Sequence, residues 1–285
     1  MRAHVIDAGF AVAARLNRFG LAPYTARARR IVARLGGDEH LVEVDGLTIG
    51  GSLADHGTYL RSLTGPGAHP FQLELFVDAI APGSVVLDCG AHVGLHSMLA
   101  ARRVGAGGTV IAVEPAPASA AALRANAREN GFEQRIEVIE AAAADSGGTA
   151  PLHLHTALDQ AGLIPLRGGV NRTIDVPRVP LDEVMGERRF DVAKIDVEGA
   201  EGPAIAGLER TLARSSGATL FVEVHSARVE DSGADPMELL RGLSERGKLE
   251  LIDEHQRRLV PASEDELARA VREQPMAFNV RWTLD

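Results

Sequence analysis

From residue 84 onward, segments typical of strands alternate with segments typical of helices, and this alternation constrains the fold more than any other feature of the sequence. Short apolar runs are followed by longer amphipathic stretches that end at glycine, as at Gly105 and Gly131. This order is typical of a parallel sheet covered by helices on both faces. Strands are expected at residues 85–88, 109–114, 136–140, 190–196, 219–225, 249–253 and 277–282. We therefore predict an α/β protein with a doubly wound, mostly parallel, Rossmann-like sheet of seven strands.

The first part of the chain predicts an extension that precedes this sheet. Apolar residues recur at helical spacing over residues 5–35, which predicts two short helices. Residues 40–51 alternate around an Asp-Gly pair and predict a β-hairpin. A further helix is expected over residues 71–80. We expect residues 1–80 to form a helical and hairpin extension that contacts the substrate or a second copy of the chain. Formation of a homodimer is therefore one of the alternatives.

The sheet domain is expected to occupy residues 81–285. Within it, residues 147–180 are rich in Gly, Pro, Arg and His and have little helical pattern. We predict that this segment is an insertion with at most short strands.

Composition limits the classes of partner and the compartment. With 285 residues, 45% of them hydrophobic, the chain can bury a full core. Its formal net charge of -9 opposes nucleic-acid binding, which relies on a basic surface. Cys89 is the one cysteine, and no apolar run approaches the ~20 residues of a membrane helix. We therefore expect a cytoplasmic protein without stable membrane insertion, acting on a small molecule.

A glycine-bearing turn follows the first strand of the sheet. Residues 85–94 read Val-Val-Leu-Asp-Cys-Gly-Ala-His-Val-Gly and lead from a strand directly into a helix. Small residues there allow close backbone approach to a ligand, and free N–H groups at the start of a helix attract an anion. A dinucleotide motif G-x-G-x-x-G does not fit, because His92 and Leu95 stand where glycine is required. The turn suits a carboxylate better than a pyrophosphate.

Acidic residues at two strand ends favour a cofactor that carries an amino acid and a ribose. Asp88 would repel a pyrophosphate but can receive an ammonium group. Glu114 can accept hydrogen bonds from the two hydroxyls of a ribose. The small residues Ala142, Ala143 and Ala144 leave a slot for a flat adenine. This combination favours S-adenosylmethionine over NAD.

Five segments together resemble the FkbM family of methyltransferases. They are Asp-Cys-Gly-Ala-His-Val-Gly-Leu at residues 88–95, Glu114-Pro115, the helix with Leu123, Asn126 and Asn130, Val-Pro-Leu-Asp at residues 179–182, and Lys-Ile-Asp-Val-Glu-Gly-Ala-Glu at residues 194–201. The similarity spans about residues 74–223, and the last segment is its most specific element. The family usually has asparagine where this chain has His92. The resemblance implies a class I methyltransferase fold and O-methylation of a secondary metabolite, sugar or lipid-linked glycan, without a required metal.

The expected cofactor site follows from these segments. The residues expected to bind S-adenosylmethionine are Asp88, Gly90, Ala91, His92, Gly94, Ser97, Glu114, Pro115, Ala143 and Asp196.

The reaction site is expected where the fourth and fifth strands end. Methyl transfer requires alignment of the acceptor with the methyl group and removal of a proton from the acceptor. His225 is the first candidate for the base, because an ordinary imidazole pKa of ~6.5 suits proton uptake near neutrality. Asp196 is the rival, and Glu223 completes the expected catalytic set. We assign no metal, although Asp196, Glu198, Glu223 and His225 also suit a divalent cation. Lys194 is expected to pair with one of these acids.

Two other functions remain open at this point. One is a nicotinamide-dependent oxidoreductase on the same sheet, against which Asp88 and the absent third glycine argue. The other is a binding module that retains the cofactor pocket without catalysis. Among methyltransferases, a carboxylate or nitrogen acceptor needs the same cofactor geometry as a hydroxyl. We expect the acceptor pocket to be formed by the N-terminal segment, including Tyr59 and Phe71, and by residues 147–180.

Overall fold

The computed structural model describes residues 39–65, 70–155, 160–165 and 172–285. The two helices predicted in residues 5–35, and the self-association expected through them, lie outside the described residues. No helix in the described part of the chain is long and apolar enough to cross a membrane.

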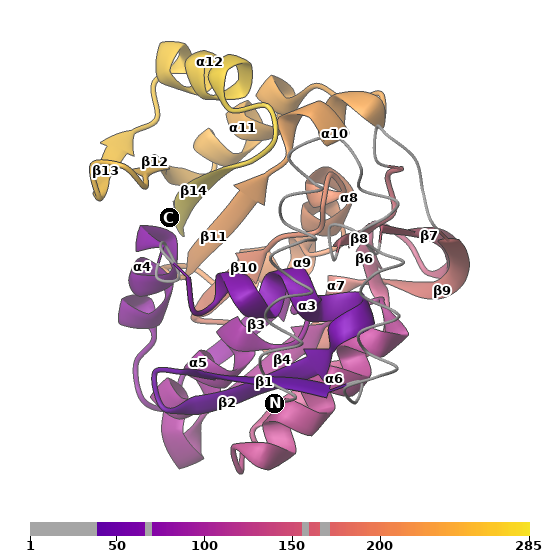
Figure 1. The fold of residues 1–285 in the computed structure, drawn as a ribbon. Coiled ribbons are helices and arrows are strands. Elements are labelled where there is room, and N and C mark those ends of the chain that lie inside the picture. Colours follow the sequence, from indigo (N-terminus) through magenta and orange to yellow (C-terminus); the bar gives the residue numbers. More distant parts are fainter. Residues whose placement is uncertain (1–38, 66–69, 156–159, 166–171) are drawn as a thin grey trace.

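The main sheet has the predicted doubly wound topology (Figure 1). In spatial order its strands are β13 (Arg258–Pro261), β12 (Gly247–Asp253), β14 (Phe278–Leu284), β11 (Thr219–Val224), β10 (Val192–Ile195), β3 (Val85–Cys89), β4 (Thr109–Val113) and β5 (Ile136–Ile139). The run from β11 to β5 is parallel, and β14 joins it antiparallel to β11. The seven predicted strands are confirmed, and the short edge strand β13 is an eighth that the sequence pattern did not reveal.

Helices cover both faces of this sheet. One face packs against α4 (Phe71–Ala79), α5 (Leu95–Val104) and α6 (Pro117–Glu129), and the other against α7 (Leu181–Met185), α8 (Glu201–Ala206), α9 (Glu209–Arg214), α11 (Pro236–Ser244) and α12 (Glu264–Glu273). Successive residues of β3 point into opposite layers, since Val86 belongs to the first core and Leu87 to the second. Burial on both faces explains why the strands read as continuous apolar runs. The remaining short helices are η1 (Gly105–Gly107) and α10 (Ser226–Asp231).

The N-terminal extension packs on α6. The predicted hairpin forms β1 (Glu39–Val44) and β2 (Leu47–Ser52), with Asp45 and Gly46 in the left-handed conformation at the turn. The Asn126 amide of α6 donates to the carbonyl of Gly50 and accepts from its N–H, at 2.9 and 2.8 Å. The hairpin is therefore fixed to the sheet domain through buried hydrogen bonds.

The next helix, α3 (Leu53–Ser62), was not predicted. Its sequence signal is Ser52, whose side chain accepts from the N–H of Ala54 as an N-cap. One apolar cluster contains residues from both sides of position 80, including Ile49, Phe76 and Val86. The division of the chain at residue 80 remains a prediction.

Residues 147–180 contribute three strands to a small separate sheet, and two of them, of eight and nine residues, correct the expectation of at most short strands. The order of this sheet is β6 (Ala142–Ala144), β9 (Arg172–Pro180), β7 (Gly148–His155) and β8 (Gln160–Gly162). Pro151 made β7 hard to predict from the sequence, because proline is rare inside strands. Pro151 lies outside the part of β7 that pairs with β8, so its missing N–H is not needed there. Leu152 and Val176 form a separate small core under this sheet.

Candidate functional site

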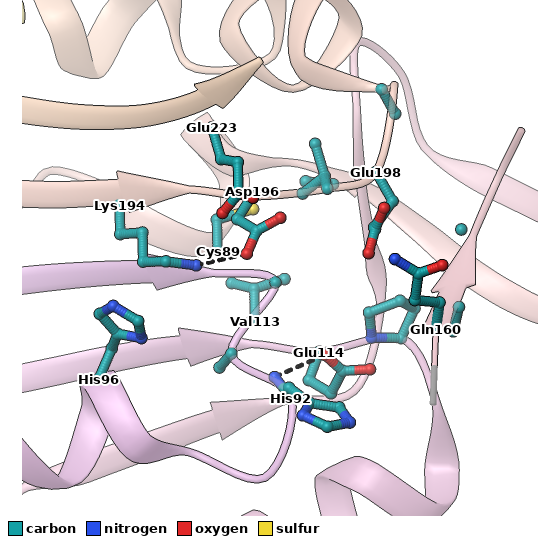
Figure 2. A pocket seen from close by; sticks show the side chains of 18 of the residues that line it. Cys89, His92, His96, Val113, Glu114, Gln160, Lys194, Asp196, Glu198 and Glu223 are labelled. Atoms are coloured by element: carbon teal, nitrogen blue, oxygen red, sulfur yellow. Dashed lines mark hydrogen bonds and ion pairs between the residues drawn. The ribbon is translucent and has the colours of Figure 1, made fainter. Parts of the chain in front are cut away.

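A cavity of about 540 Å³ lies at the carboxyl ends of the parallel strands. The chain winds from β3 to β4 and β5 on one side and then returns to β10 on the other, so the strand order reverses beside β3. This is where open α/β sheets bind ligands. One half of the cavity is lined by Cys89, Gly90, Ala91, His92, Val113, Glu114, Pro115, Ala141, Ala142 and Ala143. The other half contains Tyr59, Gln72, His96, Lys194, Asp196, Glu223, Glu254 and Asn279. Figure 2 shows Lys194, Asp196 and Glu223 above, His92 and Glu114 below, and Glu198 and Gln160 of β8 to the right.

The glycine turn is folded back against the neighbouring strands. Gly90 has φ of 81°, and a Cβ there would lie 1.7 Å from the carbonyl oxygen of Asp196. Only glycine therefore allows the turn to approach the end of β10 so closely. The N–H groups of Gly90 and Ala91 both donate to the carbonyl of Val113, and that of Gly94 donates within the turn. These N–H groups are not free for a carboxylate, which differs from the expectation for this turn.

The carboxylate of Glu114 joins the glycine turn to the start of the next helix through hydrogen bonds. One carboxylate oxygen accepts from the N–H of His92 and the other from the N–H of Ala116, each at 2.8 Å. Burial raises the pKa of this carboxyl to about 7, although both backbone hydrogen bonds oppose the shift. A carboxylate oxygen has a second acceptor position, so Glu114 can still accept from a ribose hydroxyl. It lines the cavity beside Pro115 and Ala143, as predicted for a cofactor site.

Asp88 and Ser97 lie beneath the cavity and do not line it. Both are fully buried, and the Ser97 hydroxyl donates to one Asp88 oxygen at 2.5 Å. The other Asp88 oxygen is buried without a hydrogen-bond partner. Burial raises the pKa of Asp88, and Lys194 opposes this shift. Asp88 therefore bonds to α5 and does not line the cavity, and direct contact with a cofactor amino group remains a prediction.

His92 stands where the family usually has asparagine. Its φ of 52° is left-handed, a conformation that histidine and asparagine tolerate better than most residues. Its ring packs edge-on against Tyr59, with centroids 4.5 Å apart, and against His56. Burial lowers the pKa of His92 to about 3, so the ring is neutral. The substitution therefore preserves the turn and adds an aromatic contact to α3.

Carboxylates gather in the other half of the cavity. Lys194 donates to Asp196 at 2.8 Å, which confirms the predicted pairing (Figure 2). Burial alone would raise the pKa of Asp196, but the charges of Lys194 and His225 lower it to about 2. Glu223 lies beside Asp196 and shows the opposite shift, because the Asp196 charge and then burial raise its pKa to about 7. The two strand ends thus hold one permanently ionised carboxylate and one that titrates near neutrality.

His225 lies behind these carboxylates and does not line the cavity. Its Nδ1 is 2.9 Å from the fully buried carboxylate of Glu201, and its Nε2 is 3.2 Å from Glu198 and 3.9 Å from Glu223. Burial would lower the pKa of the imidazole, but the Glu201 hydrogen bond and the charges of Glu198 and Asp196 raise it to about 9. A protonated imidazole surrounded by carboxylates is poorly suited to accept a proton. This geometry favours Glu223 over His225 as the base.

Arg228 was missed by sequence reasoning. From α10 its guanidinium contacts the Glu198 carboxylate at 3.0 Å, the Glu198 carbonyl and the side chain of Gln160 in β8. The loop that it contacts is constrained, since Glu198 and Gly199 both have left-handed φ. Arg228 thereby connects the inserted sheet to the end of β10. No local pattern marks it, because its partners are distant in sequence.

The same cluster has a spacing that a metal ion can bridge. One ligand atom from each of Asp196, Glu198 and His225 lies within 4.8 Å of the others. Lys194 and Arg228 already place positive charge against two of these groups. We therefore describe the cluster as an ion-pair network and assign no metal to it.

The half of the cavity that contains Lys194, Asp196 and Glu223 also contains residues that were not predicted. They are Gln72, His96, Glu254 and Asn279, together with Thr58, Ser62 and Pro70. Tyr59 lines the cavity as expected, but Phe71 does not. Glu254 accepts from the backbone N–H groups of Phe71 and Gln72 at the start of α4, which has no side-chain cap of its own. This contact joins residues 183 and 182 positions apart, so no local pattern announces it.

Comparison with known proteins adds independent information. The profile described as the methyltransferase FkbM domain matches residues 88–249. A curated protein from Streptomyces tacrolimicus, named 31-O-demethyl-FK506 methyltransferase FkbM, is 32% identical to this chain. The match covers 46% of this chain and 61% of that protein, so the chain spans less than two thirds of the length of that relative.

Among solved structures the similarity is weaker. The O-methyltransferase TomG from Streptomyces achromogenes, involved in tomaymycin synthesis, is 13% identical with a TM-score of 0.46, covering 81% of this chain and 86% of that one. A putative rRNA methylase from Clostridium thermocellum is 11% identical with a TM-score of 0.47, covering 75% and 94%. Similarity at this level is too weak to support any statement about the activity.

Proposed function

Because the chain belongs to the FkbM methyltransferase family, we propose that it is an S-adenosylmethionine-dependent O-methyltransferase that acts on a hydroxyl of a small molecule, such as a secondary metabolite, sugar or glycolipid. The observation that carries this proposal is the division of one cavity into two halves. Glu114 and the glycine turn line one half, and the Asp196 and Glu223 carboxylates line the other. The name of the relative from Streptomyces tacrolimicus, which specifies an oxygen acceptor, supports a hydroxyl.

The first half of the cavity fits the cofactor. Of the residues that line this half, Glu114 would accept hydrogen bonds from the ribose hydroxyls, and Ala141, Ala142 and Ala143 would lie beside the adenine. The close approach of Gly90 to β10 keeps the floor of this half free of side chains. When bound, S-adenosylmethionine supplies an electrophilic methyl group next to a cationic sulfur.

The second half, with Lys194, Asp196 and Glu223, supplies the base and is called the acceptor half from here on. The hydroxyl of the acceptor donates a hydrogen bond to Glu223, and this carboxylate takes the proton as the oxygen is methylated. Asp196 cannot perform this role as well, because Lys194 holds it ionised as a very weak base. His225 and Glu201 act through Glu198 and Asp196 as positioning residues. Tyr59 and the start of α4 line this end of the cavity.

A ligand panel tests the cofactor. We expect S-adenosylhomocysteine to raise the melting temperature of the protein, and NAD and NADP to leave it unchanged. Stabilisation by a nicotinamide nucleotide alone would contradict the proposal.

A labelling experiment tests the reaction. The protein is incubated with methyl-labelled cofactor and an extract of small molecules, and labelled products are identified by mass spectrometry. We expect label on an oxygen, and at least about a hundredfold slower labelling with the Glu223→Gln variant as the control. Tight binding of the cofactor without transfer to any acceptor would instead indicate a module without catalysis.

A further inference from the structure

Among the described residues, those that line the acceptor half of the cavity carry an excess of negative charge. The lining residues that carry a charge when ionised near neutral pH are Lys194, Asp196, Glu198, Glu223 and Glu254. Two of these carboxylates have a cationic partner, since Asp196 pairs with Lys194 at 2.8 Å and Glu198 with Arg228 at 3.0 Å. After this pairing, the charges of Glu223 and Glu254 remain.

These two carboxylates lie at the same edge of the sheet. Glu223 is in β11, next to the cavity-lining Asn279 of β14 in the strand register, and Glu254 directly follows β12. The cation nearest to Glu223 is the ring of His225, at 3.9 Å and shared with Glu198, Asp196 and Glu201. Within the described residues, Glu254 is bound only by the backbone N–H groups of Phe71 and Gln72. Neither carboxylate therefore has a cation of its own.

The two imidazoles of this region do not balance that charge. His96 lines the acceptor half and His92 the boundary with the cofactor half. Burial holds the pKa of both rings well below the ordinary value, so both are neutral. An anion entering this half would meet carboxylates and find no unpaired guanidinium or ammonium group among the described residues.

We infer that the methyl acceptor is a hydroxyl compound that is neutral or positively charged near the reacting oxygen, and that carboxylate and phosphorylated acceptors are rejected. The inference rests on the proposed function and narrows its substrate class. An anionic group near the half-buried Glu223 is repelled where solvent screens less than in bulk water, and the exposed Glu254 at the rim adds a weaker repulsion. An ammonium group at the same place is attracted.

Charged cofactor analogues test this inference without knowledge of the acceptor. Two adenosine probes are compared in which nitrogen replaces the cofactor sulfur and carries either an aminoethyl or a carboxymethyl arm. Each arm places a fixed charge in the acceptor half. Binding is measured by titration calorimetry, with S-adenosylhomocysteine as the reference ligand that has no arm. We expect the ammonium probe to bind at least about tenfold more tightly than the carboxylate probe.

Variants assign the preference to the two carboxylates. Glu223→Gln should reduce the ratio of the two dissociation constants about tenfold, and Glu254→Gln at the rim about threefold. In the Glu254→Gln variant the one amide oxygen can still accept from one of the two N–H groups at the start of α4, so the substitution removes the charge and keeps one of the two capping hydrogen bonds. Glu245→Gln, an exposed position just after α11, is the matched control and should leave the ratio unchanged.

The outcomes separate the inference from the proposed function. Equal binding of the two probes, or tighter binding of the carboxylate probe, overturns the inference while cofactor binding stands. If the reference ligand and both probes all fail to bind, the proposed function is wrong and the charge inference falls with it. In the labelling experiment, methyl groups that are released by mild alkali would reveal ester products and hence a carboxylate acceptor, which also overturns the inference.

Discussion

At the scale of single residues, Glu223 has the clearest consequence for activity. Its pKa of about 7 predicts that kcat/KM rises with pH through neutrality, because the free enzyme needs this carboxylate ionised to take a proton. We expect Glu223→Gln to lower kcat by about 10²- to 10⁴-fold and to remove this acid limb. S-adenosylhomocysteine binding, measured in parallel, should change little. An acid limb that survives in the variant would assign the base to another group.

Glu114 is the corresponding residue for binding. Its carboxylate connects the turn, through His92, to the start of α6, through Ala116. We expect Glu114→Ala to weaken S-adenosylhomocysteine about tenfold to a hundredfold, because both the ribose acceptors and the alignment of the turn are lost. Titration calorimetry measures this, with circular dichroism to show that the fold is intact. Unchanged affinity would place the ribose elsewhere.

At the scale of elements, the turn between β3 and α5 depends on one glycine. A Cβ on Gly90 would overlap the carbonyl oxygen of Asp196, and the φ of 81° is unfavourable for any other residue. We expect Gly90→Ala to lower the free energy of unfolding by about 3 kcal/mol or more in urea denaturation. Gly131→Ala is the control, since Gly131 ends α6 with a left-handed φ of 69° and a Cβ there would meet nothing within 4 Å. It should cost about 1 kcal/mol. Equal effects would mean that the turn can move away from β10.

The attachment of the hairpin to α6 is a second property of elements. The Asn126 side chain is buried and bonds to Gly50 and to the carbonyl of Val93, so it links the extension to the cofactor turn. We expect Asn126→Ala to cost about 2 to 4 kcal/mol, since it leaves buried backbone groups without partners. Asn130→Ala removes partly buried bonds to Thr48 and should cost less. The reverse order in urea denaturation would contradict this account.

At the scale of the whole molecule, the site makes stability depend on pH. The pKa values of Glu114 and Glu223 rise on folding from an ordinary value of 4.5 to about 7, and that of His225 rises from 6.5 to about 9. A group whose pKa is raised by folding stabilises the native state below its unfolded pKa, and this stability is lost as pH rises through the folded pKa. The protein without cofactor should therefore become less stable between about pH 5 and pH 9, as these groups lose protons that the native state binds more tightly than the unfolded state.

Urea denaturation across this pH range measures the loss. Glu223→Gln should flatten the decline between pH 5 and pH 7, because the amide does not titrate. Saturation with S-adenosylmethionine should also reduce it, since a cationic ligand stabilises ionised carboxylates. A stability that increases from pH 5 to pH 9 would show that the carboxylates of this site are ionised at no cost in the native state.

The sequence alone determined the order of strands and helices and the positions where the parallel strands end. Burial on both faces makes such strands apolar throughout, and glycine, proline and capping residues mark the ends of elements, so these signals are local. For the same reason Glu114, Asp196 and Glu223 could be predicted to face a common cavity, because parallel strands deliver their carboxyl ends to one edge.

Only the tertiary structure decided how these groups divide the chemistry. The charge of Lys194 keeps Asp196 ionised, and the charge of Asp196 in turn raises the pKa of Glu223. Glu201 binds the His225 ring outside the cavity. All three effects depend on distances between strands. The contact of Glu254 with the start of α4 and that of Arg228 with β8 join segments far apart in the sequence. Electrostatic coupling acts through space, so no pattern along the chain records it.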